Sequence, residues 1–325
     1  MQVQEHLTAT IRPFDPTDYD AIARLHSVNF PEFAMDAAEW RFDDEHRPEH
    51  CRSARWVAEQ GDQVVAFAQY DQHAGHYHPR KFHLALVVDP DHLGRGIGRR
   101  LFDLVLAAVR VFDPLSVDVW SREDMSGRIG FFARRGFIED WRMWTSALDL
   151  TAFDPSRFAH VVPAVEAQGI QIRSLADLGP TDPVVRRRLY EMWLEVRQDV
   201  PDPATDDYVV VPFERFQENI DRPYLLPAGY FVAVDGDQYV GTSQLWMSPE
   251  AGVLRTGLTG VRRAYRRRGI ALAMKVRSLE LGQRLGYQRV ITENELHNQG
   301  MLAINDELGF VKNPAWAHYL KSFEA

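Results

Sequence analysis

Hydrophobic and polar positions recur along the chain with two periods, one typical of strands and the other of amphipathic helices. In the first half the pattern predicts mixed helices and strands, at residues 19–28, 55–59, 64–70, 82–88, 99–111, 115–120, 128–135 and 137–148. The second half repeats that order, at residues 184–196, 213–220, 230–234, 238–247, 254–261, 272–285, 289–292, 301–308 and 310–322. Helices interspersed with strands in this way indicate an α/β fold for each half.

Short motifs of the first half recur in the second half at a nearly constant distance. The separation of Gly96 from Phe137 equals that of Gly269 from Phe310 (137 − 96 = 310 − 269), and the two glycines stand at an offset of 173 (269 − 96). A repeat of this length is a domain rather than a solenoid unit. We expect an N-terminal domain over residues 1–150, a C-terminal domain over 170–325, and a linker over 151–169, which has two prolines and no strong period.

Composition narrows the class of protein. A chain of 325 residues with 45% hydrophobic and 26% charged residues is long enough for two globular cores. No apolar run reaches the roughly 18 residues of a membrane span, and the first residues show no secretory signal. The single cysteine, Cys51, allows no intrachain disulfide and has no activating neighbours, so we expect an inert thiol and a cytoplasmic protein. The net charge of −9 argues against a nucleic-acid partner and suits a cationic substrate.

The most distinctive chemistry lies in residues 265–271, which join the predicted strand 254–261 to the predicted helix 272–285. Three consecutive arginines precede Gly269 and Ala271, whose small side chains let a ligand approach the backbone closely. Backbone amides at a helix start point at such a ligand, and the helix dipole favours a negative charge there. The loop therefore predicts a site for an anion such as a pyrophosphate.

The order of Arg266, Gly269, Ala271, Asn298 and then Gly309-Phe310 resembles the coenzyme A loop and following helix of the GNAT N-acyltransferase superfamily. Residues 92–98 resemble the same loop in the first copy. This resemblance covers nearly the whole chain and implies two tandem GNAT-like domains, each a twisted mixed sheet flanked by helices. It also implies acetyl-CoA as co-substrate and no metal. Monomer and homodimer both remain open.

The resemblance assigns cofactor-binding positions in both copies. In the second copy these are Val261, Arg266, Arg267, Arg268, Gly269, Ile270, Ala271 and Asn298. In the first copy they are Val88, Arg95, Gly96 and Gly98. The leading loop arginine is replaced there by Leu93, and the asparagine by Met125. We therefore expect the C-terminal domain to be the catalyst and the N-terminal domain to be degenerate, although its glycines leave cofactor binding open.

Many members of that superfamily have a tyrosine general acid four residues before the glycine of the Gly-Phe pair. Here that position holds Asn305 in the second copy and Phe132 in the first, and neither side chain is an effective acid. Candidate bases on the acceptor side are Glu293, Glu295 and His297, at the end of the predicted strand that follows the loop helix. Asn298 could equally act only as a helix cap.

Two further clusters have alternative interpretations. Four histidines, His73, His76, His78 and His83, fit no zinc signature, which favours a solvated loop over a metal site. The acidic residues after the helix 184–196 would suit a wall that attracts an amine, or belong to a polar loop; they are Asp199, Asp202, Asp206 and Asp207.

The resemblance implies transfer of acetyl from acetyl-CoA to a primary amine, by direct attack of the amine on the thioester. The acceptor is expected to be a small molecule, or a peptide, with no nucleic acid and no membrane involved. The alternative is a non-catalytic acyl-CoA-binding or regulatory protein, which the missing tyrosines favour. A third interpretation, a structural pseudo-dimer of two halves, is compatible with either.

Overall fold

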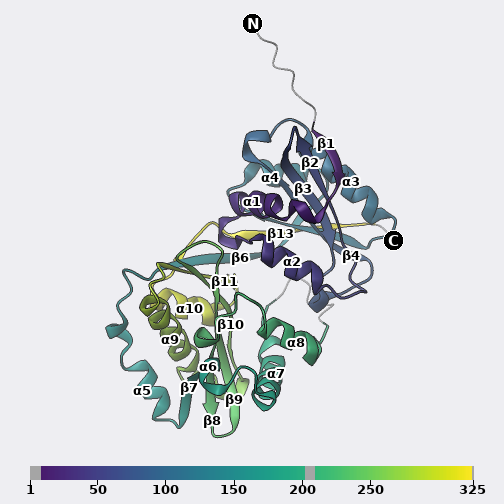
Figure 1. Cartoon of the computed structure of the whole chain (residues 1–325). Helices are drawn as coiled ribbons and strands as arrows, with labels where there is room; N and C mark the ends of the chain where they lie inside the picture. The colour runs from purple at the N-terminus through teal and green to yellow at the C-terminus, as the bar shows by residue number, and fades with distance from the viewer. Residues whose placement is uncertain (1–8, 202–208, 324–325) are drawn as a thin grey trace. The chain divides into compact units, whose positions relative to one another are not determined.

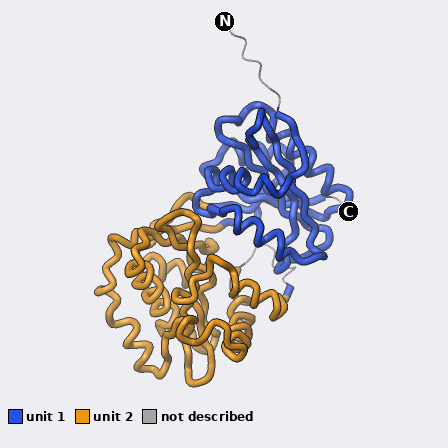
Figure 2. The backbone as a smooth tube through the Cα atoms, in the orientation of Figure 1, with its two compact units in different colours: residues 1–142, 203–209, 316–325 blue, residues 143–202, 210–315 orange. Residues whose placement is uncertain are grey.

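The computed structural model describes residues 9–201 and 209–323, which form two compact units (Figure 2). Of these residues, unit 1 contains 9–142, Val209 and 316–323, and unit 2 contains 143–201 and 210–315. Each unit has a sheet with helices packed on it, so the α/β fold predicted from the sequence is confirmed. Within the described segments, no helix is both long and apolar enough to cross a membrane.

The sheet of unit 1 contains one parallel pair among antiparallel pairs. Its strands follow the order β1 (Thr10–Pro13), β2 (Ala54–Gln60), β3 (Gln63–Asp71), β4 (Lys81–Val88), β5 (Ser116–Arg122), β13 (Trp316–Ser322) and the start of β6 (Ile138–Asp149). The strands β4 and β5 are parallel. The helices are α1 (Tyr19–Asn29), α2 (Ala37–Glu45), α3 (Ile97–Arg110) and α4 (Ser126–Ala133) (Figure 1).

Helices cover both faces of this sheet because successive side chains of a strand point in opposite directions. Ala66 and Ala68 of β3 belong to the core cluster that also contains the apolar side of α3. Phe67, between them, packs edge-on against Trp40 of α2.

Unit 2 repeats this plan. Its strands follow the order β6, β11 (Arg289–Glu295), β10 (Val253–Val261), β9 (Gln238–Met247), β8 (Phe231–Asp235) and β7 (Ile170–Ser174), and the short β12 (Val311–Lys312) also pairs with β6. The helices are α5 (Val161–Glu166), α6 (Leu175–Leu178), α7 (Pro183–Arg197), α8 (Phe213–Ile220), α9 (Ile270–Arg284) and α10 (Gln299–Leu308). One core cluster lies under α5 and α9, and a second contains the apolar sides of α7 and α8.

The sequence offset of 173 recurs in the structure. It separates the first residues of α3 and α9 (270 − 97), of β5 and β11 (289 − 116) and of α4 and α10 (299 − 126). The central part of each unit, which carries the candidate cofactor loop, is thus one structural motif used twice.

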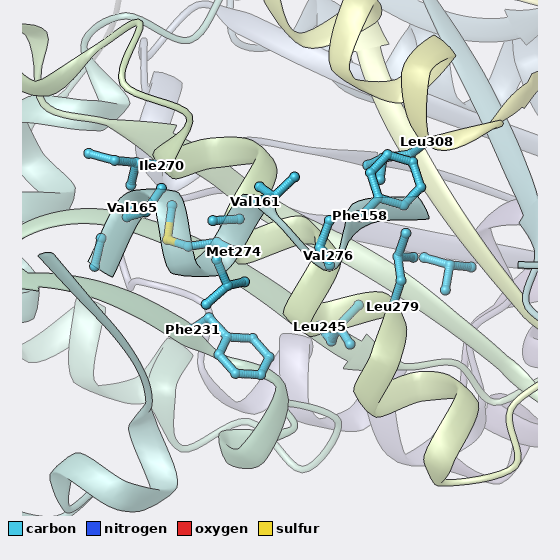
Figure 3. Packing of buried hydrophobic residues seen from close by; sticks show 14 of the residues in the cluster. Phe158, Val161, Val165, Phe231, Leu245, Ile270, Met274, Val276, Leu279 and Leu308 are labelled. Atoms are coloured by element: carbon cyan, nitrogen blue, oxygen red, sulfur yellow. The ribbon is translucent and has the colours of Figure 1, made fainter. Parts of the chain in front are cut away.

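Residues 151–169 contribute to the core of unit 2, whereas the sequence led us to expect a linker. Phe158, Val161 and Val165 are buried and pack with the apolar side of α9 (Figure 3). Pro155 and Pro163 lie in the first turns of short helices, where a missing amide removes no helical hydrogen bond. The prolines therefore mark helix starts rather than an extended connection.

The closing strands belong to different units from those expected. Residues 143–149 of β6 pair with β11 of unit 2, from Met143 opposite Glu295 to Asp149 opposite Arg289. The last strand, β13, pairs along its whole length with β5 of unit 1. The compact units consequently do not end at residues 150 and 170, because the first sheet is completed by the end of the chain.

A row of alternating carboxylates and imidazoles crosses this part of the unit 1 sheet. The ring Nδ1 of His83 on β4 lies 2.6 Å from a carboxylate oxygen of Asp118 on β5. His318 on β13 lies between Asp118, at 3.2 Å, and Asp140 of β6, at 2.5 Å. Burial alone would lower the pKa of His318, but its hydrogen bonds to the two carboxylates raise it to about 9.

The contacts in this row also shift the pKa values of His83 and Asp118. Burial works against the charge on His83 too, yet the neighbouring Asp118 raises the pKa of that imidazole above its ordinary value. Burial likewise works against the charge on Asp118, but the two imidazoles hold its pKa well below the usual range. Removing one member of a buried ion pair leaves an uncompensated charge, so such pairs favour one partner and one register. We infer that His318 specifies the position of β13 in unit 1.

Replacing His318 with Gln should lower the free energy of unfolding by about 2–3 kcal/mol at pH 6. The folded-state pKa of His318, about 9, lies above its unfolded value of roughly 6.5, so the imidazolium stabilises fully below pH 6.5. That stabilisation is lost as the pH rises through about 9. Chemical denaturation at several pH values from 6 to 9.5 measures it. His160→Gln, at an exposed histidine, is the control. A difference between wild type and His318→Gln that does not change with pH would contradict this role.

Candidate functional site

The loop before the first core helix has the same backbone conformation in both units. Gly269 has φ 79° and ψ 0° and precedes α9, and Gly96 has φ 78° and ψ −2° and precedes α3. Such left-handed angles favour glycine. Neither helix start has a side-chain cap, so the first amides of α9 and α3 are free of capping side chains and can bind an anion.

Unit 2 places an arginine where unit 1 has a second left-handed glycine. Arg267 has φ 61°, and the equivalent Gly94 has φ 76°. A left-handed conformation costs a residue with a side chain roughly 1–2 kcal/mol. The fold of unit 2 therefore retains some backbone strain in order to present Arg267 beside the start of α9.

The other loop arginines have partners within unit 2. Arg266 donates to the carbonyl oxygen of Val261 at 3.0 Å, which ties the end of β10 to the loop. Arg263 and Arg266 both form ion pairs with Asp199. Arg268 donates to the side chain of Gln168 at 2.9 Å.

Two consequences follow for the residues predicted from the sequence. The carboxylate of Asp199 is bound to loop arginines, chiefly Arg263, whose hydrogen bond holds the pKa of Asp199 below its ordinary value. Because this carboxylate already has cationic partners, it is not free to attract an acceptor amine. Asp202, Asp206 and Asp207 lie outside the described residues. Among the described residues, Arg267 is the loop arginine with no hydrogen bond or ion pair, which leaves its guanidinium available to an anion.

In both units the parallel strands beside the loop pair only at their beginnings. In unit 2, Val253 to Arg255 of β10 pair with Arg289 to Ile291 of β11, and beyond these residues the two strands no longer pair with each other. In unit 1, Lys81 to His83 pair with Ser116 to Asp118, and the strands part in the same way. This separation leaves the β11-facing edge of β10 available to an extended ligand arm.

The edge of β10 at this separation carries a β-bulge. The register between β9 and β10 shifts between Thr256 and Thr259, whereas β4 pairs with β3 regularly from His83 to Val88. A bulge leaves a residue out of the ladder and is common beside active sites. Gly257 lies in the bulge. A Cβ at this position would come within 2.3 Å of the indole nitrogen of Trp246, so the bulge favours glycine here.

In unit 1 an arginine spans the separated strands. Arg128 of α4 donates to the carbonyl oxygen of Leu86 on β4 and, at 3.1 Å, to that of Trp120 on β5. Its guanidinium also lies over the ring of Phe132, and burial lowers its pKa to about 10. The equivalent residue of unit 2 is Met301 (301 − 128 = 173), which offers no such donor. Thus Arg128 joins the separated strands of unit 1, whereas in unit 2 the hydroxyls of Thr256 on β10 and Thr292 on β11 bond each other at 2.6 Å just beyond the last pair.

Among the three candidate bases, Glu293 has the most suitable environment. It lies on the part of β11 that pairs with β6 but not with β10, and it is reached by solvent, while burial of its carboxyl group raises its pKa to about 7. The charge of Arg255 opposes this only in part. A pKa near 7 suits a general base.

The other two candidate bases bind one another. The buried carboxylate of Glu295 accepts a hydrogen bond from the backbone amide of His297 at 2.7 Å and lies 2.6 Å from its ring Nδ1. The ring of His297 is otherwise exposed. We therefore regard Glu295 and His297 as a structural pair at the end of β11.

The two predicted asparagines lie in α10 and at its start. Asn298 caps α10, since its side-chain oxygen accepts from the amide of Met301 at 3.3 Å. Asn305 is buried, and its side-chain amide donates to Asn294, the neighbour of Glu293 on β11. The side-chain oxygen of Asn305 has no hydrogen-bond partner among the described residues. This unpaired oxygen marks the α10 side of the separated strands as a place where a ligand could donate.

The remaining predicted cofactor positions are placed as follows. Ile270 points into the core, so it offers only its amide, while Ala271 continues α9. In unit 1, Arg95 donates to the carbonyl oxygen of Asp91, Val88 lies at the end of β4, and Gly98 packs against it. Neither Arg128 nor the bulge at Gly257 was predicted from the sequence. A comparison of residues 173 positions apart would have shown that Arg128 corresponds to Met301 and marked this difference between the two halves.

No group of three or more histidine, cysteine or carboxylate side chains arranged for a metal ion exists among the residues that the structure describes. Of the histidine cluster considered from the sequence, His83 bonds Asp118, and the ring of His73 lies 5.5 Å from that of His83.

Comparison with known proteins agrees with this geometry. Residues 52–139 match the model of an acetyltransferase (GNAT) domain, and residues 188–310 match that of the acetyltransferase (GNAT) family. The chain is similar to a tandem GNAT protein from the clavulanic acid biosynthesis pathway, with 20% identity and a TM-score of 0.74, covering 97% of this chain and 98% of that one. It is also similar to a GCN5-related N-acetyltransferase from Sphaerobacter thermophilus, with 20% identity, a TM-score of 0.66, and coverage of 97% and 95%.

A curated relative matches one part of the chain. N-alpha-acetyltransferase 30 from Schizosaccharomyces pombe is 23% identical over 137 residues, which cover 38% of this chain and 91% of the relative. At these identities the solved structures establish the fold.

Replacing Arg128 with Met, the residue of unit 2, should lower the free energy of unfolding by about 1–3 kcal/mol, because two carbonyl oxygens lose their donor. Equilibrium denaturation measures the change. Arg134→Met, an exposed arginine just after the same helix, should have little effect. Equal stability of Arg128→Met and wild type would show that this bridge contributes nothing.

Proposed function

The chain belongs to the GNAT family of acetyltransferases, and on that premise we propose that unit 2 transfers acetyl from acetyl-CoA to a primary amine of a small molecule. Enzymes of this family act on an acyl-CoA and an amine acceptor. The observation that carries the proposal is the separation of β10 from β11, with the uncapped start of α9 beside it and Glu293 on its edge.

The residues of unit 2 fit an anionic cofactor. The amides that follow Gly269 and the unpaired guanidinium of Arg267 would hold the diphosphate, since an anion is favoured at a helix start. Arg266 would act indirectly, because its hydrogen bond to Val261 fixes the loop against the end of β10. The unpaired edge of β10, with its bulge, would bind the arm that carries the thioester.

Glu293 would supply the base. Attack of a neutral amine on the thioester carbon forms a carbon–nitrogen bond, breaks the carbon–sulfur bond with its electron pair on sulfur, and releases one proton from nitrogen. Glu293, ionised in part at neutral pH, would accept that proton directly or through water. Positioning of the two reactants would supply much of the remaining acceleration.

We assign no acetyl transfer to unit 1. Arg128 already donates to both of its separated strands, and the regular β4 lacks the bulge of β10. An arm between these strands would have to displace the guanidinium and leave it without its acceptors.

A non-catalytic acyl-CoA-binding protein is the second candidate, favoured by Asn305 at the position of the usual tyrosine acid. Release of free thiol from acetyl-CoA, measured with a panel of small primary amines and one peptide amine, separates the two. The peptide is included because one relative is named an N-alpha-acetyltransferase. Binding without thiol release for every amine would favour the binder.

Replacing Gly269 with Asp should abolish coenzyme A binding, because a carboxylate would stand at the anion-binding helix start in a left-handed conformation. Gly269→Ala carries the same strain without the charge and should bind more weakly than wild type but measurably. Titration calorimetry with coenzyme A should give one site per wild-type chain, and Gly96→Asp should keep that site. Two sites in the wild type, or a site that survives Gly269→Asp and disappears in Gly96→Asp, would reverse the assignment of units.

Replacing Glu293 with Gln should lower kcat/KM by about 10²–10³-fold, because an amide cannot accept the proton. In the wild type kcat/KM should rise as the pH passes about 7, where Glu293 ionises, and the variant should lose this rise. Glu295→Gln is the matched comparison and should cost less than about 10-fold, since that carboxylate is occupied by His297. A larger loss in Glu295→Gln than in Glu293→Gln would move the base to Glu295.

A further inference from the structure

Unit 2 contains a buried lysine without an anionic partner. Lys275 lies on α9 with 3% of its surface exposed. Among the described residues it makes no hydrogen bond or ion pair, and its Nζ lies 5.2 Å from the centre of the ring of Phe310. Burying an unpaired ammonium is costly, so packing alone gives no reason for a lysine at this position.

The surroundings of Lys275 lead to the separated strands. Phe310 donates its backbone amide to the carbonyl oxygen of Asn305 at 3.0 Å. Asn305 in turn donates to Asn294, which lies on β11 beyond its last pair with β10. Lys275 therefore belongs to the α10 side of β11, whereas Glu293 points to the opposite face.

The equivalent positions of unit 1 are apolar. Lys275 corresponds to Phe102 and Asn305 to Phe132, at the common offset of 173 (275 − 102 and 305 − 132). Phe102 packs against Phe137, the counterpart of Phe310, at 6.1 Å between ring centres. The unit whose strands are bridged by Arg128 thus has an aromatic core here, and the other unit has a lysine and an asparagine.

We propose that Lys275 donates the proton that the coenzyme A thiolate takes up as it leaves the site in unit 2. This rests on the proposed function. When the carbon–sulfur bond breaks, its electron pair stays on sulfur, and the ammonium of Lys275 gives that sulfur one proton and becomes a neutral amine. Glu293 takes the proton of the acceptor amine on the other face, and exchange with water restores both groups.

The environment of Lys275 suits repeated proton exchange. Burial lowers its pKa to about 8, and no neighbouring charge contributes to that shift. Asp306 and Glu307 of α10 are exposed, and on α9 itself Glu280 lies beside Arg277. Glu293 and Glu295 of β11 both point to the opposite face of the sheet. A lysine whose pKa is about 8 is a far better acid toward a thiolate than a lysine in water.

The test is Lys275→Met, which keeps the length of the side chain and removes the charge. It should lower kcat by about 10²-fold. Affinity for coenzyme A by calorimetry should stay within about 3-fold, because the lysine acts on the departing sulfur. The midpoint of thermal unfolding should rise, since an unpaired buried charge is removed. Arg277→Met, a half-exposed arginine on the same helix, is the control and should leave kcat unchanged.

Two further readouts separate a proton donor from a structural lysine. The wild-type kcat should fall as the pH rises past about 8, where Lys275 loses its proton, and Lys275→Met should lack this fall. The double variant Lys275→Ala with Asn305→Tyr places a phenol on the same side. Its kcat should be at least about 10-fold higher than that of Lys275→Ala alone.

The proposal is overturned if Lys275→Met keeps the wild-type kcat, if the alkaline fall persists in that variant, or if mass spectrometry finds Lys275 itself acetylated during turnover. If the wild type is active, any of these results overturns only the role of Lys275 and leaves the proposed function standing. A wild type that binds coenzyme A but releases no thiol with any amine of the panel sinks the proposed function and this proposal together.

Discussion

The candidate site depends on a parallel pairing that stops early. Three residue pairs join β10 to β11, and beyond Arg255 and Ile291 the strands continue without a ladder between them. Backbone amides and carbonyls need hydrogen-bond partners, so an interrupted ladder inside a fold leaves groups that another molecule or a side chain must satisfy. Glu293 and Asn294 both lie on the part of β11 that pairs with β6 but no longer with β10, and as successive residues of a strand they point to opposite faces.

The two units satisfy these groups differently. In unit 1 the guanidinium of Arg128 joins the separated strands, and Phe102 and Phe132 extend the apolar core beside them. In unit 2 the equivalents are Met301, Lys275 and Asn305, and the adjacent strand carries a bulge. The same structural plan thus occurs once with an arginine joining the separated strands and an aromatic core beside them, and once with a lysine and an asparagine at the equivalent positions. This difference is the physical basis for expecting chemistry in one unit only.

Exchange of the closing strands links the halves of the sequence. The end of the chain completes the sheet of unit 1, where His318 is held between Asp118 and Asp140. Part of β6 in turn enters unit 2, where Thr145 stands opposite Glu293. A cut of the gene between the two sequence repeats would therefore remove a strand from each unit, which explains why the repeat boundary is a poor guide to an independently folding half.

Much of this protein was determined by features that are local in sequence. The periodicity of apolar residues predicted the helices and strands, the repeat at an offset of 173 predicted the duplicated motif, and the left-handed geometry of Gly96 and Gly269 matches the glycines singled out from the loop pattern. Each of these depends on neighbours within a short stretch of chain or on a direct comparison of two stretches, so the sequence carries it directly.

Only the tertiary structure decided which strand pairs with which, and what each polar group meets. Alternation shows which side chains share a face but not which strand lies beside it, so the exchange of β6 and β13 had no local signal. The pairing of Asp199 with loop arginines, the bridge made by Arg128 and the burial that brings Glu293 and Lys275 toward neutral pKa values all join residues distant in the chain. Such properties arise from packing, because desolvation and partner choice exist only once the fold has formed.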